Sequence, residues 1–341
     1  MTNAKHIVVT GGAGYIGSVV AAQLIAAGHR VTLLDNLSRG HREAVPAGAE
    51  LVAGDVADRA LLDTLFAPRG VHAVVHLAAL LEVGESMRVP ERYFRNNSAG
   101  TLTLLEAMLA HGVRRIVFSS TAALFGDPER VPIDETHPLR PCNVYGESKL
   151  MTERMLEWFH RIHGLRYASL RYFNAAGAAG AQGEDHQPES HLIPLILQVA
   201  LGQRAHVEIY GTDYPTPDGT CVRDYIHVSD LATAHLLALD ALEEQGRLLY
   251  NLGNGQGFSV RQVIETARRI TRHAIPAVES ARRAGDPAVL VASSEKIRRE
   301  LRWAPRRSAL ETIIADAWEW HRQHPRGYAG AKAPGASSGA D

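Results

Sequence analysis

The stretch VVTGGAGYIGS, residues 8–18, decides the fold of this chain. Gly11, Gly14 and Gly17 follow a short apolar run and lead into the first helical pattern. Glycines in this arrangement allow a tight turn, close approach of the backbone to a pyrophosphate, and close packing of helix against strand. The N–H groups at the helix start favour phosphate. A merely flexible loop is the alternative, but the flanking patterns favour a dinucleotide-binding loop.

Acidic residues end the next two apolar runs. Asp35 ends the second run, where a carboxylate accepts hydrogen bonds from the ribose hydroxyls of an adenosine. A carboxylate there would repel a 2′-phosphate, so the sequence predicts NAD rather than NADP. Asp55 ends the third run. It is equally suited to contact the adenine or to cap a turn.

Apolar runs and helical patterns alternate through the first half of the chain. Runs that are apolar throughout are typical of strands covered on both faces, as in a parallel sheet. The alternation predicts an α/β fold, a Rossmann-type doubly wound parallel sheet with a smaller C-terminal α/β substrate lobe. The predicted strands are 6–10, 30–35, 50–55, 73–79 and 115–120, and the predicted helices are 15–28, 58–67, 91–111 and 144–163.

The pattern changes near residue 175, which predicts a domain boundary. Residues 1–174 are expected to form the NAD-binding domain, with later segments returning to it, and 175–328 mainly a smaller, substrate-binding lobe. Residues 329–341 lack an apolar pattern and are expected to be disordered. The predicted lobe contains a polar binding loop at 174–191, an apolar element at 192–202, helices near 229–244 and 259–272, strands at 207–211 and 248–253, and a loop at 212–228.

Composition excludes several classes of function. The 36 basic and 37 acidic residues nearly cancel and form no basic block, so no nucleic-acid or membrane partner is expected. Cys142 and Cys221 have no paired spacing, which predicts a reducing, cytoplasmic location. The 17 histidines include no H-E-x-x-H or Cys/His pattern, so no metal is expected. No signal peptide or membrane span is expected either.

The stretch NVYGESKLMTE, residues 143–153, places Tyr145 four residues before Lys149. On a helix the two side chains lie on one face. A cation near a phenol favours the ionised form and lowers its pKa, typically by ~1 to 3. A solvated helix face is the usual alternative for such a pair. With a dinucleotide loop in the same chain, the pair indicates a tyrosine base for proton transfer.

A hydroxyl is expected to assist at a neighbouring strand end. The stretch VFSSTAALFG, residues 117–126, offers Ser119, Ser120 and Thr121. Ligands of open α/β sheets bind at the carboxyl ends of the strands. Thr121 is the preferred candidate, and capping of the strand end is its structural alternative.

Segments from residue 7 to about 325 together resemble the UDP-glucose 4-epimerase family of the extended short-chain dehydrogenase/reductase superfamily. The segments, in chain order, are TGGAGYIGS, DNL, HLAA, VGES, NNSAGT, FSSTAALFG, YGESK, LRYFNAAG and VRDYIHVSDLA. The resemblance implies a tightly held NAD and epimerisation of UDP-glucose and UDP-galactose at C4 through a 4-keto intermediate. It implies that Tyr145 is the base, that Lys149 binds the nicotinamide ribose and lowers the tyrosine pKa, and that Thr121 hydrogen-bonds the sugar.

The resemblance also assigns binding residues around these three. Those of the cofactor site are Gly11, Gly14, Tyr15, Ile16, Gly17, Asp35, Asn36, Asp55, Val56, Leu77, Ala78, Asn97, Tyr145, Lys149 and Tyr172. Those of the substrate site are Thr121, Tyr145, Asn174, His191, Leu192, Tyr210, Arg223, Arg283, Asp286 and Leu290. Arginines suit bidentate diphosphate contacts, although loop arginines are usually solvated. Asp286 suits uridine ribose hydroxyls, or merely a turn.

Two positions bear on cofactor retention and sugar specificity. Leu81 stands where relatives often carry a lysine that touches the cofactor, and leucine cannot make that polar contact. Leu290 stands where a bulky tyrosine restricts some relatives to UDP-glucose and UDP-galactose. Leucine is smaller, so partial tolerance of UDP-N-acetylhexosamines is expected unless neighbouring loops close the pocket.

Two other functions and one assembly are considered. A nucleotide-sugar dehydratase or decarboxylase of the same fold is the nearest alternative, although Ala122 and Ala123 replace the acidic pair of the dehydratases. A non-catalytic NAD-sensing module is the second.

A homodimer through helices 91–111 and 144–163 is also expected, with core packing as the alternative. The apolar side chains behind that expectation are Tyr93, Leu104, Leu105, Leu150, Met151, Met155 and Trp158.

Overall fold

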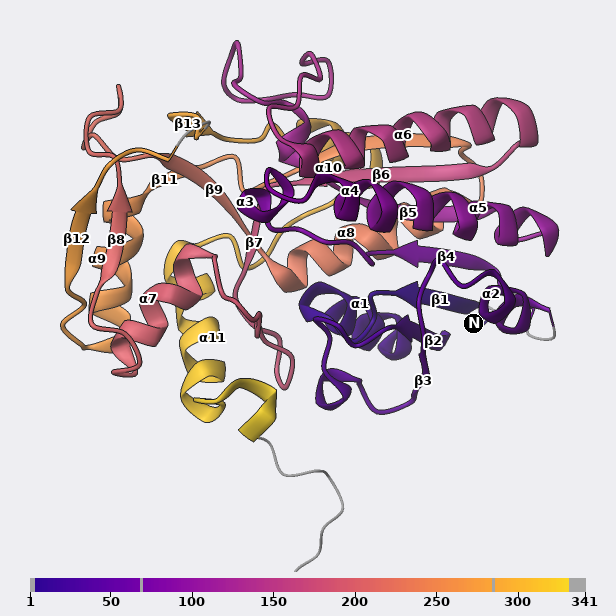
Figure 1. The fold of residues 1–341 in the computed structure, drawn as a ribbon, viewed down its shortest axis with the longest axis horizontal. Helices are drawn as coiled ribbons and strands as arrows, with labels where there is room; N and C mark the ends of the chain where they lie inside the picture. The colour runs from indigo at the N-terminus through magenta and orange to yellow at the C-terminus, as the bar shows by residue number, and fades with distance from the viewer. Residues whose placement is uncertain (1–3, 68–69, 284–285, 331–341) are drawn as a thin grey trace, which may run out of the picture.

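The computed structural model describes residues 4–67, 70–283 and 286–330. A parallel sheet flanked by helices forms the larger part, and a smaller lobe lies beyond the carboxyl ends of its strands (Figure 1). Of the tail predicted to be disordered, residues 331–341 lie outside the described residues.

The larger sheet has seven parallel strands in the order β10-β6-β5-β4-β1-β2-β3. The chain order reverses between β1 and β4, and such a switch point is where open α/β sheets bind ligands. This confirms the predicted Rossmann-type fold class. The strands are β1 (His6–Thr10), β2 (Arg30–Asp35), β3 (Ala49–Ala53), β4 (Ala73–His76), β5 (Arg115–Thr121), β6 (Arg166–Tyr172) and β10 (Arg247–Leu252).

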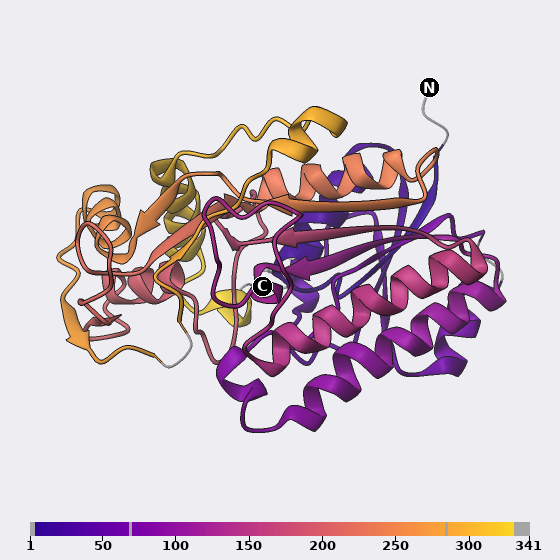
Figure 2. The same ribbon diagram turned by 90° about the horizontal axis from the view of Figure 1, so that it is seen from above.

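Helices cover both faces of this sheet (Figure 2). Ile7 and Val9 of β1 pack toward α1 (Tyr15–Ala26) and α8 (Val228–Ala241), while Val8 packs toward the opposite layer. This alternation follows from the two-residue period of a strand. The opposite layer contains α2 (Arg59–Phe66), α5 (Gly100–Ala110) and α6 (Val144–His163). Short helical turns lie between these elements: η1 (Arg42–Ala44), α3 (Val83–Ser86), α4 (Pro90–Tyr93), the π-helical η2 (Phe94–Ala99) and η3 (Ala122–Leu124).

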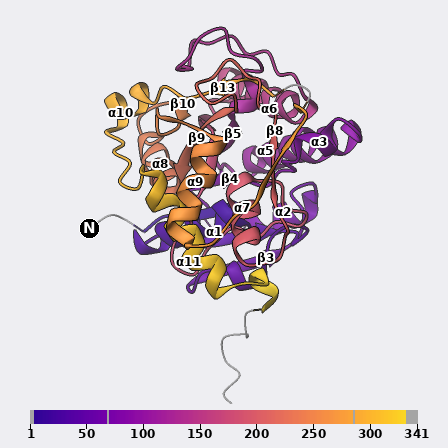
Figure 3. The same ribbon diagram turned by 90° about the vertical axis from the view of Figure 1, so that its left-hand side faces the viewer.

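The smaller lobe has its own core and faces the viewer in Figure 3. Its first sheet joins β7 (Asn174–Ala176), β9 (Val222–His227), β11 (Gly257–Ser259) and β13 (Val289–Leu290). Its second sheet pairs β8 (Val207–Tyr210) with β12 (Ala277–Ser280). Its core is covered by α7 (Leu192–Ala200), α9 (Val260–Thr271) and α11 (Leu310–Gln323), and the chain also contains α10 (Glu295–Leu301) and η4 (Gly327–Gly330).

Two elements assigned to the smaller lobe from the sequence belong to the larger part. β10 pairs with β6, and α8 packs on α1. Leu231, Leu239 and Tyr250 are buried in the same core cluster as β1. The sequence analysis expected later segments to return to the first domain but placed these two in the smaller lobe, because long-range pairing has no local signal in the sequence.

The predicted loop 212–228 contains the central strand β9, so that part of the prediction is wrong. Asp224 sits in the middle of this strand and is fully buried, which a loop reading of the sequence does not anticipate. Its carboxylate accepts hydrogen bonds from the backbone N–H groups of Asn254, Gly255 and Ala292. A buried carboxylate is tolerated only with such partners, so Asp224 ties β9 to two other segments of the lobe.

Over the residues described, the helices are either too short or too polar to cross a bilayer.

Candidate active site

A cavity of about 1130 Å³ lies between the carboxyl ends of the parallel strands and the smaller lobe. It is lined by nearly all the residues expected from the sequence. These are Gly11, Gly14, Tyr15, Ile16, Gly17, Asp35, Asn36, Asp55, Val56, Leu77, Ala78, Thr121, Tyr145, Lys149, Tyr172, Asn174, His191, Leu192, Tyr210, Arg223, Arg283, Asp286 and Leu290.

The glycine loop forms one end of the cavity. Gly11 has φ +69°, and a Cβ there would lie 2.7 Å from the backbone nitrogen of Ala78. A Cβ on Gly17 would lie 2.1 Å from the carbonyl oxygen of Gly11. Gly14 caps α1 without any side-chain hydrogen bond, so the first N–H groups of the helix are not satisfied by a capping side chain. The loop therefore presents backbone donors to the cavity, as a diphosphate requires.

Asp35 and Asp55 lie at the ends of adjacent strands. Asp35 accepts the backbone N–H of Ala13 at 3.0 Å and of Leu37 at 2.8 Å. Burial raises the pKa of Asp35, although these two hydrogen bonds oppose the shift. Asp55 caps a turn by accepting the N–H of Ala57 at 2.8 Å, and it also accepts the amide of Asn36 at 2.8 Å. Asp55 therefore caps a turn, which was one of the two roles considered for it from the sequence, and it also lines the cavity.

The three candidate hydroxyls at the end of β5 point to different partners. Ser119 Oγ lies 2.9 Å from His235 Nε2, and Ser120 Oγ donates to Glu153 at 2.7 Å. Thr121 Oγ1 accepts the N–H of Ala123 at 3.1 Å and, unlike the two serines, lines the cavity. Because side chains alternate along a strand, Thr121 and Ser120 point to opposite sides. Thr121 also caps the end of the strand, which was the structural alternative considered for it.

Tyr145 and Lys149 lie in the first turns of α6, which Asn143 caps. Lys149 is buried, and its ammonium donates to the Ser119 carbonyl oxygen at 2.9 Å and lies 4.9 Å from the centre of the Phe118 ring. Burial lowers the pKa of Lys149 to about 7. The ammonium is thus held in place without a carboxylate partner.

The electrostatic effect on Tyr145 differs from the sequence expectation. Burial raises the pKa of Tyr145, the Thr121 hydroxyl lowers it, and the charge of Glu82 raises it. The four-residue spacing predicted that Lys149 lowers this pKa, but the group that lowers it in the protein is the Thr121 hydroxyl, and desolvation of the phenolate is the largest effect.

Glu82 is a cavity residue that the sequence analysis missed. It lies in the segment after β4 and forms an ion pair with Arg39 at 3.0 Å, and both side chains line the cavity. The signal in the sequence was an acidic residue directly after Leu81, at a strand end of the sheet. Leu81 also lines the cavity.

Asn97, predicted to frame the cofactor, is absent from the cavity lining and is almost fully buried. Its amide exchanges two hydrogen bonds with the backbone of Leu80, at 2.8 and 3.0 Å, and donates to Ser148 Oγ at 3.0 Å. Asn97 therefore joins the cavity segment at Leu80 to α6, behind the site.

The smaller lobe contributes cationic side chains to the opposite wall. Arg223 donates to the carbonyl oxygens of Val222 and Pro287 at 2.9 Å and lies 3.8 Å from the Asp286 carboxylate. The Arg283 guanidinium lies 3.8 Å from the centre of the Tyr210 ring. Leu290 pairs with Arg223 in the β-sheet register.

Two predicted substrate residues lie elsewhere on this wall. Asn174 donates to the Asp224 carbonyl oxygen at 2.9 Å, which ties β7 to β9. His191 precedes Leu192 at the start of α7, and its Nδ1 lies 2.8 Å from Glu184 and 3.1 Å from Glu189. His191 is therefore held in a polar cluster at the edge of the cavity.

The sheet, the glycine loop and the enclosed tyrosine, lysine and threonine define a Rossmann-fold enzyme of the dinucleotide-dependent type. The model of the NAD dependent epimerase/dehydratase family matches residues 7–253. This chain belongs to that family.

Three relatives show how far the similarity extends. The UDP-glucose 4-epimerase of Halalkalibacterium halodurans is 54% identical over 325 residues, which cover 94% of this chain and 97% of the relative. A crystal structure of a UDP-glucose 4-epimerase superposes with a TM-score of 0.93 at 49% identity, covering 95% of this chain and 99% of that one. The crystal structure of the Bifidobacterium longum UDP-glucose 4-epimerase in complex with NAD+ and UDP superposes with a TM-score of 0.91 at 37% identity. The match covers 95% of this chain and 100% of that one.

The position of Glu82 leads to a prediction about Tyr145. In Glu82→Gln the negative charge that raises the phenol pKa is removed, so Tyr145 should ionise at lower pH than in the wild type. Titration of protein labelled with ¹³Cζ-tyrosine measures this, with Tyr145→Phe assigning the resonance. Glu85→Gln is the matched control, since Glu85 also lines the cavity. An unchanged or raised pKa in Glu82→Gln would contradict the electrostatic role.

Proposed function

We propose that this chain is an NAD-dependent epimerase that interconverts UDP-glucose and UDP-galactose at C4. The observation that carries the proposal is the convergence of Tyr145, Thr121 and Lys149 in one cavity, with a dinucleotide loop at one end and two arginines at the other. The relatives named as UDP-glucose 4-epimerases support the same reaction and substrate class.

The residues of the cavity fit NAD. The glycines leave no space for side chains where a pyrophosphate would approach, and the start of α1 offers backbone donors. Asp35 would accept the ribose hydroxyls, while Lys149 would bind the nicotinamide ribose. Bound here, NAD would supply a reversible hydride acceptor for the sugar C4 and so would not be consumed overall.

The chain's own residues hold and move the proton. Tyr145 takes the proton of the sugar O4 hydroxyl, and Thr121 hydrogen-bonds the same region of the sugar. The Ser119 carbonyl positions the ammonium of Lys149 one helical turn from Tyr145. Burial raises the pKa of Tyr145 and the Thr121 hydroxyl lowers it, so added positive charge near the phenol would favour its ionised form.

The smaller lobe anchors the part of the substrate that does not react. Arg223 and Arg283 are suited to the diphosphate, and Asp286 to the uridine ribose. Binding energy from this remote part lets the keto sugar turn over within the site without escaping.

Two other functions are separated by one experiment. A dehydratase needs further acid/base groups beside the strand-end hydroxyl, but Thr121 is followed by Ala122 and Ala123. A sensing module has no use for an enclosed tyrosine base. Incubation with UDP-galactose without added NAD should give UDP-glucose as the product. Loss of water would indicate the dehydratase, and no conversion, even with added NAD, would indicate the sensor.

We also propose a cytoplasmic location. Cys142 and Cys221 are both free thiols, which fits a reducing compartment.

Tyr145→Phe should retain NAD and UDP but lose most of the epimerase rate. Removal of a general base typically costs ~100- to 10,000-fold. Steady-state kinetics with UDP-galactose measures the loss, and calorimetric titration with UDP checks that the site is intact. A decrease below tenfold would exclude Tyr145 as the base.

Leu290 should permit slow turnover of UDP-N-acetylglucosamine. It lines the cavity and packs on the cluster that contains Ala122 and Phe173. Hydrophobic pockets discriminate by only ~1 to 3 kcal/mol per methylene-sized change, so leucine should slow the larger substrate rather than exclude it. Leu290→Tyr should lose this activity while retaining that on UDP-glucose. If neither enzyme accepts the N-acetylated sugar, Leu290 is not the determinant.

We further propose a homodimer through α5 and α6, which run side by side (Figure 2). Tyr93, Leu104, Leu105 and Leu150 are buried within the chain, so core packing accounts for them. The proposal depends on the outward-facing apolar side chains of these helices. They are Leu102, Met151, Trp158 and Ile162, with Trp158 60% and Ile162 67% exposed.

Light scattering at micromolar concentration should therefore give twice the mass of the chain. Trp158→Glu should shift the protein toward the monomer, because it places a charge in the apolar face. Val131→Glu, at another exposed apolar position, should leave the mass unchanged. A monomeric wild type would reject the dimer.

A further inference from the structure

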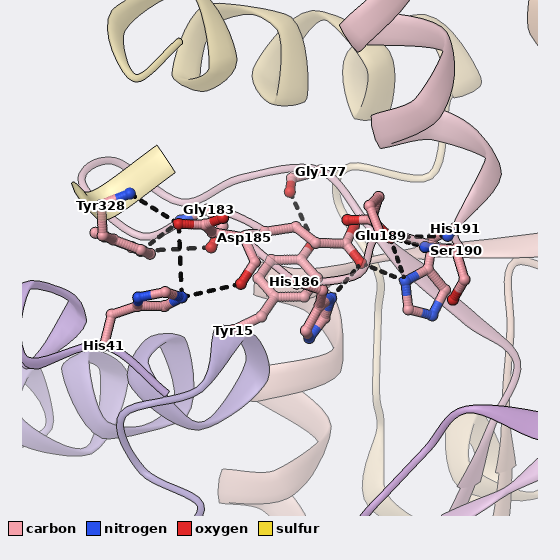
Figure 4. A network of polar contacts seen from close by, with 11 residues as sticks. Tyr15, His41, Gly177, Gly183, Asp185, His186, Glu189, Ser190, His191 and Tyr328 are labelled. Carbon is pink, nitrogen blue, oxygen red and sulfur yellow. Dashed lines mark hydrogen bonds and ion pairs between the residues drawn. The ribbon is translucent and has the colours of Figure 1, made fainter. Parts of the chain in front are cut away.

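The segment Glu184–His191 contains the spacing E-x-H-x-x-E-x-H, which the motifs considered in the sequence did not include. It brings together Glu184, His186, Glu189 and His191, each of which offers one ligand atom. These four atoms all lie within 4.8 Å of one another (Figure 4). The cluster contains two imidazoles and two carboxylates at the edge of the cavity.

The contacts within the cluster are unusual for a simple ion pair. His191 Nδ1 lies 2.8 Å from Glu184 Oε1 and 3.1 Å from Glu189 Oε1, and His186 Nδ1 lies 3.2 Å from the same Glu184 oxygen. A proton on His191 Nδ1 can serve both carboxylates only as a shared, three-centre hydrogen bond. Glu189 Oε1 also accepts the backbone N–H groups of Ser190 at 2.7 Å and of His191 at 2.8 Å, and a cation would favour the close approach of the two carboxylates.

His321 of α11 supplies an independent observation. Its side chain is only 8% exposed, and its Nδ1 has no hydrogen-bond partner within the part of the chain that the structure describes. Glu184 and Glu189 are its leading charged neighbours. The charge of the cluster thus acts on a buried ring whose Nδ1 lacks a hydrogen-bond partner among the described residues.

The segment is held in this shape from outside the cluster. Tyr15 OH donates to the Gly177 carbonyl oxygen at 2.6 Å, and His41 Nε2 lies 3.0 Å from the Asp185 carbonyl oxygen. The Tyr328 backbone N–H donates to the Asp185 carboxylate at 2.8 Å (Figure 4). The two contacts to Asp185 fix the chain between Glu184 and His186.

We propose that Glu184, His186, Glu189 and His191 bind one divalent first-row transition metal, with zinc as the best match. Two imidazole nitrogens and two carboxylate oxygens form a set that zinc accepts in tetrahedral geometry. Calcium and magnesium prefer oxygen ligands alone. The ion ties the segment that follows β7 to the start of α7 and so joins the glycine-loop side of the cavity to the substrate lobe. This role is structural and does not depend on the proposed reaction.

A proton is the competing occupant. The two carboxylates hold the pKa of His191 well above its ordinary value, although burial acts in the opposite direction. In this alternative, a protonated His191 balances Glu184 and Glu189, and no metal is bound.

Metal binding can be measured directly. Full-length protein without an affinity tag, treated with chelator and then dialysed, is titrated with zinc in a calorimeter and analysed for metal content after gel filtration. We expect one zinc ion per chain and a rise in the melting temperature on zinc addition. X-ray absorption at the zinc edge should show nitrogen and oxygen ligands at ~2.0 to 2.2 Å.

Variants locate the site. His186→Gln and Glu189→Gln should each weaken zinc binding at least ~10-fold, because each removes one ligand atom of the cluster. Circular dichroism checks that both variants are folded. His163→Gln, an exposed histidine at the end of α6, is the matched control and should bind zinc like the wild type.

Three results would overturn the proposal. They are no saturable zinc binding by the wild type, equal binding by the cluster variants and the control, or sulfur ligands at ~2.3 Å, which would place the metal on a cysteine. None of them affects the proposed epimerase, whose test measures sugar conversion instead.

Discussion

The close approach of backbone to backbone at the glycine loop is the constraint on which the rest of the structure depends. No side chain fits at Gly11 or Gly17, because Ala78 and the Gly11 carbonyl occupy the space. The turn can therefore close tightly, and α1 starts directly beneath the cavity. Tyr15, the first residue of that helix, reaches the Gly177 carbonyl and so connects the loop to the segment that leads into the substrate lobe. One local turn thus orients both halves of the site.

Asp224 has the corresponding role in the smaller lobe. Its buried carboxylate accepts three backbone N–H groups from two separate segments, which holds β9 in the middle of the lobe. Arg223 and Leu290 then face the cavity from paired strands, and Asn174 is bonded to the Asp224 carbonyl. Two residues that line the cavity from the smaller lobe, Arg223 and Leu290, therefore lie in the sheet that this buried carboxylate holds together.

Desolvation of Tyr145 and Lys149 is the largest influence on their ionisation in the cavity between the two halves. Lys149 and Tyr145 are neighbours on α6, yet burial acts against the charged form of both. Thr121 favours the phenolate, while Glu82 opposes it from the other side. In a site built in this way the phenol of Tyr145 ionises less readily than a free tyrosine, and added positive charge would favour its ionisation.

The sequence by itself determined the fold class, the dinucleotide loop and most of the cavity residues. Each of these depends on local spacing: glycines between a strand and a helix, Asp35 at a strand end, and Tyr145 one turn before Lys149. The tertiary structure alone decided which hydroxyl of β5 faces the cavity, that Asn97 supports the site from behind, and that β10 and α8 return to the first sheet. It also decided that the charge of Glu82 acts on the phenol of Tyr145. It brought Glu184, His186, Glu189 and His191 of one polar segment close together. These properties depend on contacts between segments distant in the chain and on the depth of burial, and neither leaves a periodic signal in the sequence.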